Sequence, residues 1–192
     1  MKLRRSLAAA AALAVAIGLP AHARSPGSDL SEPFALGLQA GSVISGTIGQ
    51  ALFAGLSFDI PAGHPLSIMF EPSVFWVSGA NGGVFRLSLD AALRLYLFSP
   101  FVSEDRPAHW GPFIAGGAAV SWVPQQTSNF LDVIAFGPYV EAGYRLVFAD
   151  HGIFVEPAAA WTTLYGARLD PAGPSAVTSN GLFVSLAVGY RF

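Results

Sequence analysis

The sequence contains no cysteine and only one lysine, Lys2. The lack of cysteine excludes disulfides and thiolate metal sites, so an exported form of this chain would need another source of stability. Beyond residue 23, no stretch reaches the roughly 20 unbroken apolar residues that a membrane-spanning helix needs. Yet 53% of the residues are hydrophobic and only 11% are charged. This composition leaves two options, a very well covered soluble core or a surface that faces lipid.

Residues 1–23 have the pattern of a secretory signal peptide. Three basic residues within the first five are followed by a short apolar run, Leu7–Leu19, and by the small residues of Ala21-His22-Ala23. A membrane anchor left in place is the alternative, which the short run disfavours. Because no cysteine follows the run, a lipid-anchored lipoprotein is excluded. We expect export, with residues 24–33 as a polar periplasmic leader and 34–192 as the folded domain.

The mature chain is acidic. From Arg24 onward it has seven arginines, no lysine and twelve Asp plus Glu residues, a formal charge of −5. Because nucleic-acid binding depends on basic surfaces, this balance predicts no nucleic-acid partner. The remaining 169 residues suit a single domain.

Apolar residues alternate with polar ones over long stretches. From Phe85 to Leu97 every second residue is apolar, which is the period of a β-strand with two different faces. The same period is found in 50–60, 66–77, 134–148, 153–165 and 182–192. A soluble sheet of this kind would need a second layer over its apolar face, whereas a sheet closed in lipid can be apolar outside and polar inside.

The charged residues of these stretches all fall in the polar register. We predict that they form a lumen charge network: Asp59, Glu71, Arg86, Asp90, Arg94, Glu141, Arg145, Glu156 and Arg191. An eight-stranded barrel is just wide enough for side chains to fill, so five acids and four arginines would pair, some of them bidentately, and plug the lumen. The alternative is a narrow, porin-like conduction path along the same charges. A route for hydrophobic ligands has little support from so charged an interior.

The pattern predicts an all-β fold, an eight-stranded antiparallel up-and-down transmembrane β-barrel. The expected strands are Phe34–Val43, Gln50–Ile60, Leu66–Val77, Val84–Phe98, Trp110–Val123, Leu131–Phe148, Ile153–Tyr165 and Leu182–Phe192. Both ends of the barrel chain would then face the periplasm. The outer connections would be 44–49, 78–83, 124–130 and 166–181, and the periplasmic ones would include an unexpectedly long turn at 99–109. Proline within paired strands predicts bulges at Pro72 and Pro157, and local register shifts at Pro112 and Pro138.

Tryptophan positions give an independent indication of topology. Trp76, Trp122 and Trp161 fall near the far ends of outward-running strands, whereas Trp110 opens a strand at the opposite interface. Amphipathic rings prefer both membrane interfaces. We therefore predict an aromatic girdle: Trp76, Trp110, Trp122, Trp161, Tyr190 and Phe192. Ordinary core tryptophan is the alternative.

The final segment, Leu182–Phe192, alternates to a terminal phenylalanine, with Tyr190 two places before it. This end resembles the closing strand of bacterial outer-membrane barrels. At this size the chain is similar to the small eight-stranded group that includes the OmpA, OmpX and OmpW types, although it matches no subfamily motif. The resemblance implies a place in the cell outer membrane, contact with outer-membrane lipid and lipopolysaccharide, and a monomer. It also implies that the barrel-assembly machinery reads Tyr190 and Phe192 as an assembly signal.

The sequence predicts no catalytic residue, metal ligand or cofactor. Barrel enzymes that modify lipid A need a serine or histidine cluster at the outer rim, whereas His64, His109 and His151 fall in predicted periplasmic turns and are expected to be solvated. We therefore predict a structural or surface-recognition role through the outer loops. A narrow channel and a lipid-modifying enzyme remain the alternatives, and a soluble lipocalin-like barrel would require the apolar register to face inward.

Overall fold

The structure is a computed structural model that describes most of the chain after residue 33. The described ranges are 34–48, 50–62, 65–79, 82–97, 109–123, 133–148, 152–168 and 175–192. The predicted signal peptide, 1–23, and leader, 24–33, lie outside them. Among the described residues, no helix is long and apolar enough to cross a bilayer.

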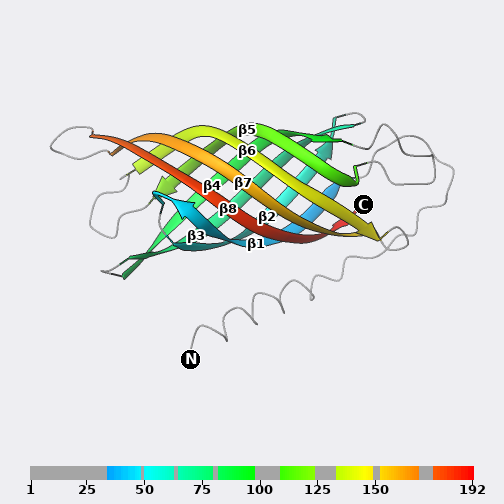
Figure 1. The fold of residues 1–192 in the computed structure, drawn as a ribbon, viewed down its shortest axis with the longest axis horizontal. Helices are drawn as coiled ribbons and strands as arrows, with labels where there is room; N and C mark the ends of the chain where they lie inside the picture. Colours follow the sequence, from blue (N-terminus) through cyan, green and yellow to red (C-terminus); the bar gives the residue numbers. More distant parts are fainter. Residues whose placement is uncertain are drawn as a thin grey trace, which may run out of the picture. The chain divides into compact units, whose positions relative to one another are not determined.

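Eight antiparallel strands form a closed barrel in which each strand pairs with its sequence neighbours (Figure 1). The first and last strands close it, with Ala35 opposite Arg191. The strands are β1 (Ala35–Gly46), β2 (Ala51–Pro61), β3 (Leu66–Gly79), β4 (Gly82–Tyr96), β5 (Gly111–Val123), β6 (Val133–Phe148), β7 (Ile153–Arg168) and β8 (Ser175–Arg191). The predicted fold class is confirmed. We call the end where β1 begins and β8 ends the proximal end, and the opposite end the distal end.

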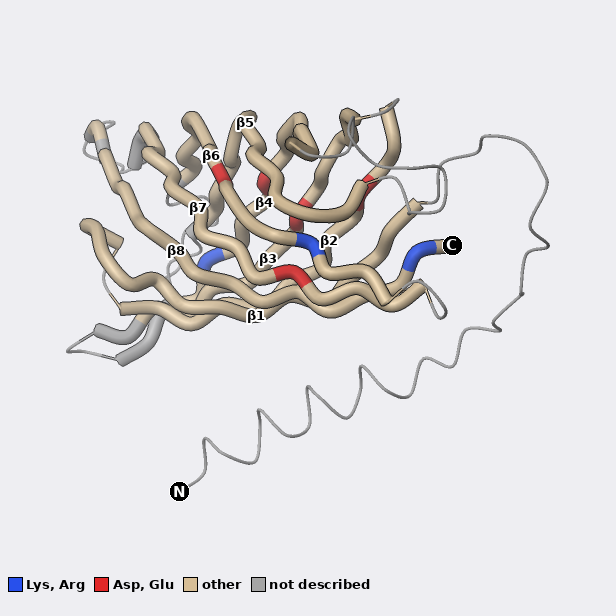
Figure 2. Tube along the Cα trace, turned by 45° about the vertical axis from the view of Figure 1, so that its right-hand side comes forward, with Lys and Arg blue, Asp and Glu red and all other residues tan. Residues whose placement is uncertain are grey.

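The alternation in the sequence becomes the two faces of the barrel wall. On β4 the side chains of Leu87, Leu89 and Leu93 point outward and are 40%, 46% and 58% exposed. Between them, Arg86 and Arg94 point inward and are 5% and 0% exposed. Figure 2 marks the charged positions along the wall. The apolar register therefore faces the surroundings, and a lipocalin-like arrangement with an apolar interior is wrong.

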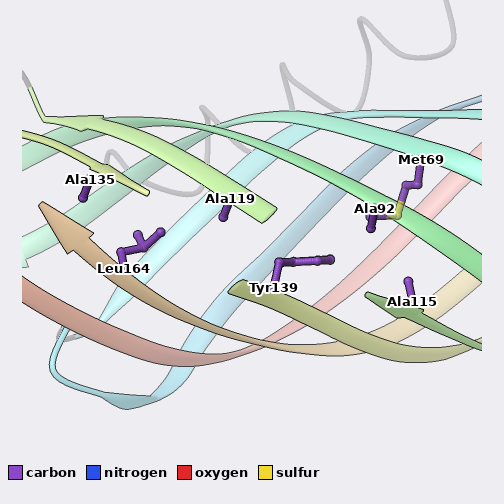
Figure 3. Packing of buried hydrophobic residues seen from close by; sticks show 7 residues of the cluster. All are labelled: Met69, Ala92, Ala115, Ala119, Ala135, Tyr139 and Leu164. Atoms are coloured by element: carbon purple, nitrogen blue, oxygen red, sulfur yellow. The ribbon is translucent and has the colours of Figure 1, made fainter. Parts of the chain in front are cut away.

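Small residues line part of the inner wall and leave room for longer side chains. Four buried alanines on β4, β5 and β6 surround three larger side chains, and the cluster comprises Met69, Ala92, Ala115, Ala119, Ala135, Tyr139 and Leu164 (Figure 3). A barrel of eight strands has space for side chains only. Alanine at these inward positions lets Tyr139 and the charged residues extend into the lumen.

The predicted bulges at the prolines are wrong. β2 and β3 keep one register from Ala51↔Val77 to Pro61↔Ser67, with a gap in pairing only beside Pro72. β6 and β7 likewise skip pairs beside Pro138 and Pro157 without a shift, and the ladder of β5 and β6 continues past Pro112 and Pro138. Proline lacks an N–H and so removes a bond, but flanking pairs hold the register. Among the described pairs, the register shift lies between β1 and β8, at Val43 and Ser45.

The predicted outer loop 166–181 is also wrong in its extent. β7 continues to Arg168 and β8 begins at Ser175, so the connection between them is 169–174. Val177 and Thr178 are β-branched and favour extended backbone. The other expected strands agree with the structure to within a few residues at each end. Residues 98–108 of the long turn, and the expected outer connection 124–130, lie outside the described residues.

Candidate functional site

Arg94 lies at the centre of the charged lumen. Its side chain points inward from β4, is 0% exposed and contacts carboxylates from four other strands. The guanidinium nitrogens lie 3.5 Å from Asp59 of β2, 3.7 Å from Glu71 of β3, 3.2 Å from Glu141 of β6 and 3.0 Å from Glu156 of β7. The contact with Glu156 is bidentate, since Nη1 also lies 3.2 Å from Oε2. A buried guanidinium without such partners would be costly, so these bonds offset its desolvation.

Arg145 of β6 is the second buried cation of the group. It bonds to Asp59 and, through Nε at 2.5 Å, to Glu156 Oε2. Two neutral donors also bond to carboxylates of this group. The Tyr96 hydroxyl donates to Asp59 at 2.8 Å, and the Ser57 hydroxyl donates to Glu71 at 3.0 Å. We call this set of ion pairs the plug: Asp59, Glu71, Arg94, Glu141, Arg145 and Glu156.

Aromatic rings pack against the faces of both plug arginines. Phe113 lies 4.1 Å from Arg94 Cζ and Phe154 lies 4.6 Å from Arg145 Cζ, measured to the ring centroids. Inward glycines make room for these rings, because a Cβ built at Gly143 would lie 2.5 Å from the Phe113 ring. Sequence reasoning missed Phe113 and Phe154. The sequence signal that could have found them is that both phenylalanines fall in the inward register, which otherwise carries the charged residues.

The structure does not bring all nine predicted charges together. Arg86 donates to the Ser121 hydroxyl, and its guanidinium lies 5.2 Å from the Phe75 ring centroid. Asp90, which is half-buried, accepts from Ser88 at 3.2 Å. Arg191 is 8% exposed at the proximal end. Six of the predicted residues therefore form the plug, two lie on the distal side of it, and one lies at the barrel's proximal end.

Three plug carboxylates have a spacing compatible with a metal ion. In the described part of the chain, oxygens of Glu71, Glu141 and Glu156 lie within 4.8 Å of one another. Arg94 Nη2, however, lies 3.7, 3.2 and 3.0 Å from the same three groups. The guanidinium thus supplies the positive charge at the position that a metal ion would need.

Most of the aromatic residues predicted for the girdle lie near strand ends. Trp76 points outward near the distal end of β3 and is 40% exposed. Trp161 also points outward and is 39% exposed, but it lies in the middle of β7, because that strand continues to Arg168. Trp122 is next to last in β5, and Trp110 directly precedes that strand at the proximal end. There, the rings of Tyr190 and Phe192 meet at 5.2 Å.

The expectation that His109 is a solvated turn residue is wrong. Its side chain is 3% exposed, and a ring nitrogen lies 3.2 Å from the Leu66 carbonyl oxygen. The ring also packs 5.1 Å from that of Tyr96, and the backbone has a positive φ of 59°. The end of the long turn therefore folds inward against Tyr96, which donates a hydrogen bond to the plug residue Asp59. His64 and His151 lie outside the described residues.

Comparison with known proteins agrees with this architecture. No protein-family model matches the chain, and no curated protein is detectably similar in sequence. Among solved structures, the fold is that of the small eight-stranded outer-membrane β-barrels, as the resemblance of the closing strand implied.

Two such structures illustrate the similarity. The outer membrane protein OprG from Pseudomonas aeruginosa matches with a TM-score of 0.52 and 12% identity, over 84% of this chain and 96% of OprG. The outer membrane protein AlkL, solved by solid-state NMR in DMPC lipid bilayers, matches with a TM-score of 0.55 and 11% identity, over 92% of this chain and 97% of AlkL. At such identities the likeness concerns the fold alone.

Proposed function

We propose that this chain is an outer-membrane barrel with a closed lumen, whose role is structural or surface recognition and not catalysis. In this proposal the proximal end faces the periplasm and the distal end faces outward. The protein is exported, assembled through the signal at Tyr190 and Phe192, and surrounded by lipid and lipopolysaccharide as a monomer.

The outer surface supports a membrane location. Large apolar side chains are exposed around the barrel, including Phe136 at 66%, Leu93 at 58% and Phe148 at 54%. In water such a surface would be an aggregation liability, whereas in hydrocarbon it costs nothing and the closed ladder satisfies the backbone. Trp76 and Trp122 near the distal ends of their strands, and Trp110 at the proximal end, suit the two interfaces of a bilayer.

The environment of Arg94 is the single observation that carries the closed lumen. Its guanidinium is fully buried and ion-paired with carboxylates from β2, β3, β6 and β7. An ion moving through the barrel would have to separate these buried, desolvated ion pairs, and separating them is unfavourable because it leaves unpaired charges away from water. With the lumen closed, the distal connections are the parts that meet the cell exterior, and loops on a rigid scaffold are a usual place for recognition.

Planar-bilayer conductance tests the closed lumen. We expect the wild-type protein to show no sustained openings. Replacing Arg94→Gln leaves carboxylates unpaired inside the barrel, so water and ions are expected to enter and openings to become frequent. Arg86→Gln is the matched control, since within the described residues no carboxylate lies within 4.0 Å of Arg86, and it should stay closed.

Two outcomes would favour the alternatives. Sustained, ion-selective openings of the wild-type protein would establish a narrow channel and refute the plug. An altered acyl pattern of lipid A, detected by mass spectrometry when the protein is expressed, would indicate a lipid-modifying enzyme and refute a non-catalytic role.

A further inference from the structure

A small polar cavity lies in the lumen beside the plug. Its volume is about 20 Å³, which is enough for roughly one or two water molecules. Glu71 of the plug, Arg86 and Asp90 are among the residues that line it. Phe53, Phe75 and Phe183 line it as well, and the rings of Phe53 and Phe75 stack with their centroids 4.9 Å apart.

The charge of the cavity wall is not balanced. Two carboxylates, from Glu71 and Asp90, face one guanidinium, that of Arg86, so the lining has a formal charge of −1. The adjoining plug adds to the negative potential, because apart from Glu71 it holds three carboxylates and only two guanidiniums. Buried charge of one sign is expensive unless it acquires a partner.

Gln39 provides a second, independent observation. Its side chain points into the barrel from β1, is 6% exposed and lines the cavity. Within the described residues, no hydrogen bond of its carboxamide is found. Buried amides are normally bonded, so an unbonded carboxamide in the wall of a cavity indicates a polar occupant.

We propose that this cavity is a binding site for one small monovalent cation, such as sodium, potassium or ammonium. The wall offers carboxylate oxygens from Glu71 and Asp90, the amide oxygen of Gln39, and hydroxyl oxygens from Ser88 and Thr162. Hard oxygen donors suit such ions. A single positive charge balances the lining, and the volume admits an ion with at most a water molecule.

Other occupants fit less well. An anion in the cavity would face two carboxylates and only one guanidinium, so it would be repelled. Mg²⁺ usually keeps several bound waters and Ca²⁺ takes six to eight oxygen ligands, whereas this cavity has room for only one or two water molecules and its lining balances one positive charge. Larger organic cations such as choline exceed the cavity. Size and charge together therefore select the small monovalent ions.

Cation-dependent stability tests the proposal. The full-length mature protein in micelles is unfolded thermally in sodium, potassium, ammonium or choline chloride, at equal concentration and pH. At least one small cation is expected to raise the unfolding midpoint above that in choline by about 2 °C or more, with saturation. The difference should vanish in Gln39→Leu and Asp90→Asn. It should persist in Asp59→Asn, which removes a carboxylate outside the cavity. Each variant is compared with itself across salts, so loss of basal stability does not confuse the result.

Anomalous diffraction from crystals soaked in rubidium or thallium(I) salts provides the direct measurement. A peak between Gln39, Glu71 and Asp90 supports the site. Equal midpoints in all four chlorides overturn it, as does a cation effect that survives both cavity variants. An unfolding midpoint that varies with pH but not with the cation would show that a bound proton neutralises the negative charge of the cavity. That result would refute the proposal as well.

Discussion

Arg94 and Arg145 each have two kinds of neighbour. Carboxylates bind the edge of the guanidinium, whereas a phenylalanine ring packs against its face. Arginine suits this environment because its planar group donates several hydrogen bonds in one plane and still stacks above and below it. A lysine ammonium has no planar group, so it could neither make the bidentate pair with Glu156 nor stack flat on the phenylalanine ring.

The Gly143→Ala variant tests this packing at the scale of one residue. An added Cβ would lie 2.5 Å from Cζ of Phe113 and 2.8 Å from the Pro157 carbonyl oxygen. Because one of these atoms belongs to the backbone, the change should destabilise the barrel by about 1–3 kcal/mol. Urea unfolding followed by tryptophan fluorescence in micelles measures it. Gly116→Ala is the control, since nothing lies within 4 Å of that Cβ, and equal stability of the two variants would contradict the packing argument.

At the scale of the strand, the two edges of β8 differ near the distal end. Asn180 bonds through its backbone N–H and carbonyl to Thr47, just beyond the end of β1. The backbone N–H and C=O groups of successive residues point to opposite sides of a strand, so those of Thr178 point to the same side as those of Asn180. At that position, however, β8 has passed its last partner on β1. The backbone groups of Ser179 point to β7, where its partner is Leu164.

Proline substitution distinguishes these two positions. Ser179→Pro removes an N–H that is bonded to β7 and should lower the unfolding midpoint clearly. Thr178→Pro removes an N–H on the open edge and should change the midpoint little. Thermal unfolding of both variants checks this. The reverse order would show that β8 has a different register.

At the scale of the whole molecule, closure makes one surface apolar and leaves the ends polar. The barrel should therefore fractionate with the outer membrane and resist protease over its strands. We expect surface-added protease to cut a protease site inserted within 169–174 in intact cells, and to leave a matching insertion in the periplasmic connection 149–151 intact. Immunoblotting of the fragments measures both. Cleavage at the second site alone would invert the proposed orientation.

Much of this architecture could be predicted, because the information is local. Six of the eight strands show alternation over ten or more residues, and the position of each charge within that pattern predicts the face on which it lies. The predicted bulges at Pro72 and Pro157 failed because flanking pairs hold the register, which no local pattern shows. The loop 166–181 was placed too broadly because its second half, 175–181, contains the serine, asparagine and glycine typical of turns but pairs as a strand with β7.

The sequence by itself determined which residues face lipid and which face the lumen, since a strand has only two faces and parity assigns each residue to one. Only the tertiary structure decided which charges meet. The register between neighbouring strands sets how far along the barrel each inward side chain lies. Arg94 therefore contacts carboxylates of four strands, whereas Arg86 lies on the distal side of them, beside Phe75. The burial of His109 and the cavity beside Gln39 likewise depend on distances across the barrel, which no pattern along one strand contains.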